Sequence, residues 1–195
     1  HGKPLGPIFS NKNITTSNID LFCADSFYFW ENRFADQTQG NQNEALRYLL
    51  DLVENAPDDV FEKFLPDILD MPQFYRLTFA SALSSSFHQG NVANQNWYFN
   101  PATGKLEPIF FDVAIIPFNG ALNVSKNRLM NRVMRIEMFR KEFYDFARTV
   151  LVDDQFLEDD LRFYDATFNR IRGDIKKDTQ KLQPTAAVFE RIKNE

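Results

Sequence analysis

Cysteine and histidine are scarce in this sequence, and their scarcity excludes several classes of site. One cysteine, Cys23, and two histidines occur among the 195 residues. A single cysteine cannot form an intramolecular disulfide, and this set leaves little room for a tetrahedral zinc site. No apolar run approaches the roughly 20 residues that cross a bilayer as a helix. The sequence therefore predicts a chain without a disulfide framework and without a transmembrane segment.

Positive charge is also in deficit. The 27 acidic residues outnumber the 22 basic ones, which gives a formal net charge of −5. Because nucleic acids need a basic surface, we expect no nucleic-acid partner. The one positive region, residues 126–141, is interpreted as a solvated helix face, and contact with a phosphate or an acidic partner is the alternative. Three acidic pairs are interpreted as capping charges at helix starts: Asp58-Asp59, Asp153-Asp154 and Asp159-Asp160.

Apolar residues, by contrast, are abundant. Hydrophobic residues make up 44% of the sequence, and phenylalanine occurs 21 times. This composition favours thick helix packing in a chain whose length suits one domain or a large piece of one. The sequence begins at His1, without an initiator Met and without a signal-peptide pattern, so we expect a processed form or a piece of a longer protein.

Hydrophobic periodicity changes at residue 43. Residues 1–43 are predicted to be an irregular amino-terminal segment, in which the aromatic run 21–34 suits a short strand or a packed helix equally well. From residue 44 to residue 195 apolar residues recur at helical spacing, interrupted by a hairpin over 96–111. We predict a mainly α chain with a small β-hairpin, an α+β fold. Its helices should start near Glu44, Asp58 and Met71 and again after Ser125, with a break near Asp153.

The most informative segment is FHQGNVANQNWYFNPATGKLEPIFFDV, residues 87–113. It predicts strands over 96–99 and 106–111, joined by the turn Asn-Pro-Ala-Thr-Gly-Lys. Asp112 follows the apolar run Ile109–Phe111, where a carboxylate is costly unless it is hydrogen-bonded or bound to a cation. Two interpretations stay open, because Asp112 can be a metal ligand or can cap the turn that follows it.

Amide side chains are dense just before the hairpin. Asn94 could ligate a metal through its carbonyl oxygen, and hard cations such as Mg²⁺ favour oxygen ligands. The alternative is a loop whose amides hydrogen-bond to their own backbone. The amide residues are Gln89, Asn91, Asn94, Gln95 and Asn96.

Nucleophilic chemistry has weaker support in the sequence. His88 follows an apolar helix, where it can act on a proton, orient the loop or simply cap the helix end. The serines of 84–86 lie near it, yet no Gly-x-Ser-x-Gly elbow surrounds them. Cys23 lies in the aromatic run and is interpreted as a core residue rather than as half of a Cys-His pair.

Taken in order, these pieces resemble the CotH family, the spore-coat-protein-H-like atypical protein kinases. The resemblance rests on Asn94, the aromatic pair Trp97-Tyr98, the turn Asn100–Lys105, the strand 106–111 and Asp112. The helical run before the loop and the helices after Asn127 are also similar, so the resemblance covers roughly residues 44–150.

The resemblance implies a protein-kinase-like carboxy-terminal lobe and phosphoryl transfer from ATP to Ser of a protein. It implies Mg²⁺ or Mn²⁺ and ATP, with the metal and the nucleotide bound by Asp112 and Asn94. Our first hypothesis then places His88 or Gln89 near the acceptor hydroxyl as the candidate catalytic residue. The implied partner is a substrate, coat or surface protein, and the implied location is extracellular or at the cell or spore surface.

Two departures from the family pattern limit this expectation. Gln89 stands where the catalytic-loop aspartate is expected, five residues before the asparagine, and glutamine cannot take a proton. Residues 1–43 also supply no basic nucleotide-binding strand, so the chain alone should bind nucleotide poorly and be inactive. A non-catalytic kinase-like binding or assembly module is therefore the second hypothesis, and an α-rich interaction domain is the third.

Overall fold

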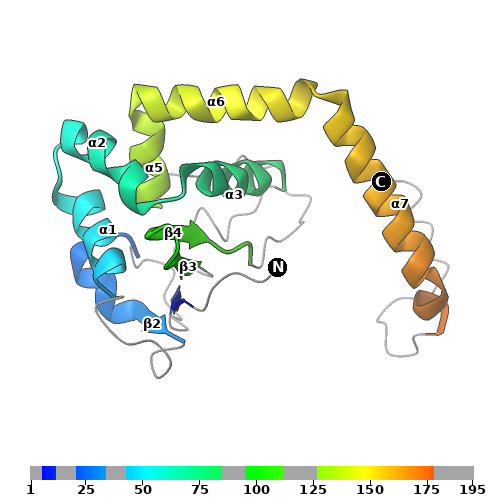
Figure 1. Ribbon diagram of the computed structural model, residues 1–195, viewed down its shortest axis with the longest axis horizontal. Helices are drawn as coiled ribbons and strands as arrows, with labels where there is room; N and C mark the ends of the chain where they lie inside the picture. The colour runs from blue at the N-terminus through cyan, green and yellow to red at the C-terminus, as the bar shows by residue number, and fades with distance from the viewer. Residues whose placement is uncertain (1–5, 12–20, 34–42, 85–94, 112–126, 178–195) are drawn as a thin grey trace. The chain divides into compact units, whose positions relative to one another are not determined.

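The computed structural model describes residues 6–11, 21–33, 43–84, 95–111 and 127–177. The chain divides into two compact units, His1–Ala147 and Arg148–Glu195. The described residues are mostly helical and include a small antiparallel sheet (Figure 1). This agrees with the predicted α+β class. Of the helices in these ranges, none is both long and apolar enough to span a bilayer.

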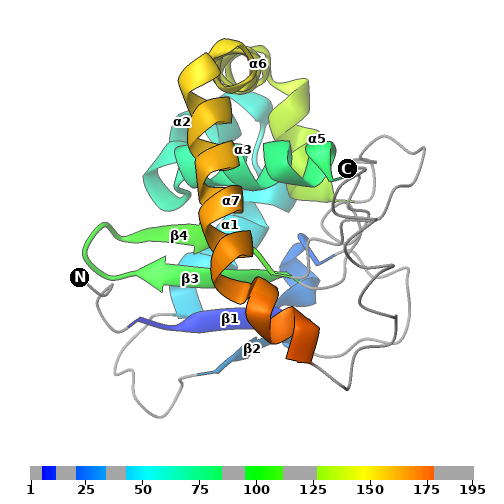
Figure 2. The same cartoon turned by 90° about the vertical axis from the view of Figure 1, so that its right-hand side faces the viewer.

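The first unit contains a four-stranded sheet in the order β2-β1-β3-β4, in which each neighbouring pair is antiparallel (Figure 2). The predicted hairpin supplies β3 and β4. Strand β1 comes from the amino-terminal segment, and it pairs with β3 on one side and with β2 on the other. The bounds are β1 Ile8–Asn11, β2 Trp30–Asn32, β3 Asn96–Asn100 and β4 Lys105–Pro108.

Alternation along the strands gives the sheet two different faces. Phe9 pairs with Trp97, so their side chains lie on the same face of the sheet. Pro108 also pairs with Trp97, and Leu106, two residues before Pro108 on β4, lies on this face as well. Phe9, Trp97 and Leu106 are at most 1% exposed and belong to the main hydrophobic core. The Trp97 ring contacts Phe22 from the aromatic run and Phe74 from α3, with centroids 5.9 and 6.4 Å away. The sheet and the helices therefore share one core.

Three helices precede the loop, and their limits follow local sequence signals. Helix α1 buries the stripe predicted from its spacing, including Leu46 and Leu50. Helix α2 contains Pro66 in its last turn, where the proline supplies no N–H to the Glu62 carbonyl, and the helix closes with the Leu69 N–H donating to the Leu65 carbonyl. The Asp70 carboxylate accepts a hydrogen bond from the Gln73 N–H at 3.0 Å and so caps α3. The bounds are α1 Asn43–Asn55, α2 Asp58–Ile68 and α3 Met71–Leu83.

Residues 127–177 form three further helices. The buried Asn127 caps α5, Arg128–Arg135, by accepting from the Met130 N–H at 3.0 Å. Helix α6, Glu137–Val152, continues from the first unit into the second. Helix α7, Asp154–Lys177, begins after the break predicted near Asp153.

The predicted helices starting near Glu44, Asp58 and Met71 are confirmed, whereas the amino-terminal segment is not wholly irregular. Strands β1 and β2 and the 3₁₀ helix η1, Ala24–Phe29, lie within residues 1–43. Within the undecided aromatic run, residues 24–29 are helical and residues 30–32 are a strand. These strands have no strong sequence signal because each is only three or four residues long and forms by pairing with distant residues.

Arg132 of α5 joins that helix to the turn between α1 and α2. Its guanidinium donates to the carbonyls of Leu52 and Val53 at 2.7 and 2.8 Å, and also to the Ala56 carbonyl. It lies 4.2 Å from the centroid of the Phe61 ring, and its side chain is 12% exposed. These carbonyls are at the end of α1, where a cation also complements the helix dipole.

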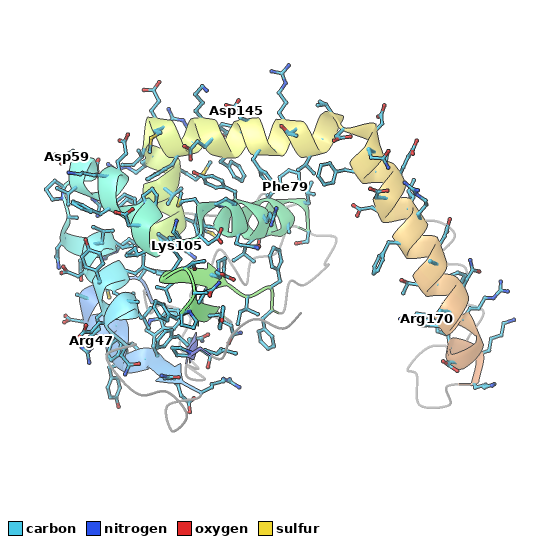
Figure 3. The ribbon with its side chains drawn as sticks, in the orientation of Figure 1. Arg47, Asp59, Phe79, Lys105, Asp145 and Arg170 are labelled. Carbon is cyan, nitrogen blue, oxygen red and sulfur yellow. The ribbon has the colours of Figure 1, made fainter. Side chains whose placement is uncertain are left out.

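Tyr75 joins α3 to α6. Its hydroxyl donates to the Glu142 carboxylate at 2.8 Å, and its ring contacts Phe143. One turn further along α3, the Phe79 ring meets Phe146, whereas Asp145 lies on the outward side of α6 (Figure 3). Burial, and secondarily the neighbouring Glu142 carboxylate, raise the pKa of the Tyr75 hydroxyl well above its usual range.

Replacing Arg132 should destabilise the first unit strongly. Arg132→Met leaves buried carbonyls without their donor, so we expect a loss of about 2–4 kcal/mol in the free energy of unfolding. Arg128→Met is the matched control, because Arg128 pairs with Glu54 at the surface and should cost less than about 1 kcal/mol. Urea unfolding measures both, and equal effects would show that Arg132 does not hold the turn.

The Tyr75 contact should appear as a loss of stability at alkaline pH. The folded chain keeps the Tyr75 phenol neutral, so its contribution is full below the ordinary tyrosine pKa of about 10 and falls as pH rises above it. Tyr75→Phe should lower stability by about 1 kcal/mol at pH 7 and flatten the alkaline decline. Glu142→Gln should keep most of that decline, since burial is the larger cause. Denaturant unfolding at several pH values is the measurement, and an unchanged decline in Tyr75→Phe would contradict this assignment.

Candidate functional site

The four residues proposed for chemistry lie outside the described residues. His88, Gln89 and Asn94 fall in 85–94, and Asp112 opens 112–126. Their assignment therefore stays a prediction from the sequence. The structure does describe what stands on either side of them, namely α3 before the loop and the hairpin between Asn94 and Asp112.

The two ends of the hairpin leave it side by side. The Ile109 N–H donates to the Asn96 carbonyl at 2.8 Å, one step beyond the pairing of Trp97 with Pro108. In sequence, Asn94 lies two residues before Asn96 and Asp112 lies three residues after Ile109. The segment that contains Asn94 and the segment that begins with Asp112 therefore leave the hairpin next to two residues, Asn96 and Ile109, that are hydrogen-bonded to each other.

Asn100 organises the opposite end of the hairpin. Its carbonyl accepts from the N–H of Gly104 at 2.8 Å, and its side-chain oxygen accepts from the N–H of Ala102 at 3.0 Å. Its amide nitrogen donates to the Glu107 carboxylate at 2.7 Å. Gly104 has φ +71°, a left-handed conformation that an L side chain adopts at a cost. The Asn-Pro-Ala-Thr-Gly-Lys turn is confirmed, and each of these contacts fixes the hairpin register.

A pocket of about 460 Å³ lies beside the hairpin, and its lining includes Tyr98 and Glu107 from the sheet face opposite Trp97. Such a volume is within the range of small-molecule sites. Register places Ile8, Tyr98 and Glu107 in one row across this face. The Glu107 carboxylate is the charged group there, in a residue only 5% exposed, and the rest of the wall is mainly apolar. The pocket residues are Ile8, Gln73, Tyr98, Glu107, Pro108, Ile109 and Phe110.

Sequence reasoning missed this pocket. The alternation in Asn96–Asn100 could have separated Trp97 and Phe99 from Tyr98, because side chains of a strand alternate between faces. The participation of Ile8 could not have been foreseen, since it depends on pairing between residues 90 positions apart (Ile8 and Tyr98). Glu107 falls within the predicted strand 106–111, and no sequence signal sets it apart as a pocket residue.

The second strand is shorter than predicted. It ends at Pro108, whereas the prediction extended it to Phe111. Phe110 and Phe111 are 47% and 52% exposed, so the residues before Asp112 do not form the buried strand that the sequence suggested. The opposing strand β3 begins at Asn96, whose carbonyl already accepts from the Ile109 N–H, so β3 offers no further residue for β4 to pair with.

The charged groups singled out by sequence serve the fold. Asp58 and Asp59 lie in the first turn of α2 as predicted, and Asp153 accepts from the Gln155 N–H at 3.0 Å before α7. The prediction for Asp159-Asp160 was wrong, because this pair lies inside α7. Within the described ranges, no group of three or more His, Cys, Asp or Glu side chains could hold a metal ion.

The basic region is not a uniform solvated face. Arg132 points inward to the α1–α2 turn, as described above. Arg128 pairs with Glu54 at 3.0 Å, and Lys141 pairs with Asp145 at 3.1 Å. Cys23, predicted to be core, is half-buried beside the fully buried Leu21 and Phe22.

Gly104→Ala should destabilise the hairpin by about 1–2 kcal/mol, because alanine must adopt the left-handed conformation. No atom lies within 4 Å of the position its Cβ would take, so the cost is conformational rather than steric. Gly173→Ala in α7 is the control with the opposite sign, since alanine is the better helix former by about 0.5–1 kcal/mol. Thermal unfolding followed by circular dichroism tests both, and a neutral Gly104→Ala would refute the turn geometry.

No family model matches the sequence, and no curated protein is significantly similar to it. The proposals below therefore stand on the residues of this chain and on the resemblance described for its loop and hairpin.

Proposed function

We propose that this chain is the metal- and nucleotide-binding lobe of a CotH-like atypical protein kinase. In the intact parent protein it transfers a phosphoryl group from ATP to Ser of a coat or surface protein. The observation that supports this most directly is the Ile109–Asn96 hydrogen bond, which brings together the backbone leading to Asp112 and the backbone leading from Asn94. A kinase-type site needs an aspartate and an asparagine at the two ends of such a unit.

The chemistry of the donors fits the proposed metal. Asp112 offers a carboxylate and Asn94 an amide carbonyl, which are the oxygen ligands that Mg²⁺ and Mn²⁺ accept beside water and phosphate. Bound metal would neutralise charge on the transferred phosphate. The protein's own contribution is positional, because the closed hairpin fixes where both segments begin and so limits the distance between their side chains.

The pocket beside the hairpin supports a nucleotide partner. Ile109 and Phe110, which line it, lie three and two residues before Asp112. A flat, apolar ring fits walls formed by Ile8, Pro108 and Ile109, and the Glu107 carboxylate could accept a hydrogen bond from an exocyclic amine. The base would then lie in the pocket.

One sequence feature favours a second candidate, a non-catalytic kinase-like assembly module. In kinases the catalytic-loop aspartate accepts the proton of the substrate hydroxyl, and Gln89 cannot do so. His88 is the neighbouring group able to take a proton. A module of this kind would still bind metal and nucleotide through Asn94 and Asp112.

Metal binding tests the proposal first. We expect ATP to strengthen Mn²⁺ binding to the natural protein that contains this sequence, and Asp112→Ala to weaken that binding about tenfold or more, because a carboxylate ligand is lost. Asp59→Ala removes an exposed carboxylate at the start of α2 and should leave binding unchanged. Electron paramagnetic resonance of Mn²⁺ measures all three, and equal binding by Asp112→Ala and the natural chain would leave only a helical interaction domain.

Phosphate transfer then separates the two candidates. We expect the natural protein that contains this sequence to incorporate labelled phosphate into Ser of a coat or surface protein, and His88→Ala to abolish incorporation. The assembly module predicts metal binding without incorporation. In that case Gln89→Asp, which restores the carboxylate of the family pattern, should create measurable transfer. If neither the natural protein nor its Gln89→Asp variant transfers phosphate, the kinase proposal is refuted and the non-catalytic assembly module remains.

A further inference from the structure

Apolar residues recur along α7 at alternating spacings of four and three residues. This is the heptad pattern of helices that pair in a two-stranded coiled coil. It continues over most of a helix of 24 residues, about 36 Å long at 1.5 Å per residue. We call these residues the α7 stripe: Leu157, Leu161, Tyr164, Phe168, Ile171 and Ile175.

Four of the six residues of the α7 stripe are largely exposed to water. Leu157, Leu161 and Tyr164 are 61%, 55% and 50% exposed, and Ile171 is 40% exposed. No residue of α7, which lies wholly within the described ranges, is buried. The Tyr164 and Phe168 rings stack one turn apart at 6.4 Å, so the stripe is a continuous apolar ridge. A ridge of this length indicates an interaction surface.

The charges of α7 are divided between its two halves. Residues 154–165 hold five acidic residues and one basic residue, a formal charge of −4. Residues 166–177, which include Arg170 (Figure 3), hold four basic residues and one acidic residue, a formal charge of +3. A helix that is acidic at one end and basic at the other is complementary to a reversed copy of itself. A parallel copy would place the two acidic halves together.

We propose that α7 pairs with the α7 of a second copy of this chain, antiparallel, along the α7 stripe. Full overlap places Leu157 against Ile175 of the second copy, Leu161 against Ile171, and Tyr164 against Phe168. Each helix is thus covered by the same surface of the other, as two-fold symmetry requires. This inference does not depend on the proposed phosphotransfer function.

The same alignment fixes which charges flank the stripe. Glu158, next to Leu157, faces Arg172 of the second copy, which is next to Ile171. By symmetry, Arg172 of the first copy faces Glu158 of the second copy at the other end of the helix pair. Asp160 faces Asp174 of the second copy, so like charges oppose there. Glu158 and Arg172 of one helix are 14 residues, or about 21 Å, apart and cannot contact each other within one α7.

A charge swap tests the arrangement in the full chain by sedimentation equilibrium. Glu158→Arg alone and Arg172→Glu alone each create two repulsive contacts, and each should weaken dimerisation about tenfold or more. An equimolar mixture of the two variants restores both attractive contacts and should dimerise as the natural chain does. Asp174→Lys removes the Asp160 repulsion and should strengthen dimerisation.

A matched pair of variants separates the stripe from general apolar exposure. Leu161→Glu lies in the stripe and should give monomers. Phe163→Glu lies beside the stripe, at a residue 73% exposed, and should leave dimerisation unchanged. A natural chain that stays monomeric at every soluble concentration overturns the proposal, as does a mixture of swap variants that fails to dimerise. If Leu161→Glu lowers the melting temperature without changing the oligomeric state, the stripe packs within its own chain and the proposal also fails.

Discussion

The hairpin of β3 and β4 is held along both of its edges, and the arrangement of the first unit depends on this. On one side β1 pairs with β3. On the other side the Asp70 N–H donates to the Leu106 carbonyl at 2.9 Å, where the chain passes from α2 to α3. A register slip of one residue would turn Trp97 out of the core, because strand side chains alternate between faces. The segments before and after the hairpin therefore start from fixed points.

The helices reinforce this frame through contacts between residues far apart in the sequence. Arg132 reaches carbonyls 76 to 80 positions away, and Tyr75 reaches Glu142 across 67 positions. The donors of both contacts, the Arg132 guanidinium and the Tyr75 hydroxyl, belong to side chains that are largely shielded from water, so each contact matters more than a surface ion pair. They hold α5 and α6 against the helices that lead into the loop. The hairpin between the proposed site residues is thus supported by helices that precede and follow it in the sequence.

Local signals made the helices and the β3–β4 hairpin predictable, whereas strands β1 and β2 depend on long-range pairing and were not predicted. Asp70 and Pro72 indicate the start of α3, and Asp153 indicates the break before α7. Strands β1 and β2 carry no comparable signal, because polar residues such as Ser10 and Asn11 occupy them and their partners lie elsewhere in the chain. Nor could the sequence show that Arg132 turns inward, since an arginine at that spacing also suits a solvated face. The roles of His88, Gln89, Asn94 and Asp112 stay predictions, for they lie outside the described residues.

Both tryptophans of the chain lie in the sheet of the first unit. Trp30 and Trp97 are 6% and 1% exposed, and each ring contacts Phe22 at 5.9 Å. The second unit contains no tryptophan. Tryptophan fluorescence therefore reports on the sheet core and does not report on α7. Far-ultraviolet circular dichroism, by contrast, measures the helices of both units together. Comparing the two signals during thermal unfolding reveals whether the two units unfold in one cooperative transition or in two.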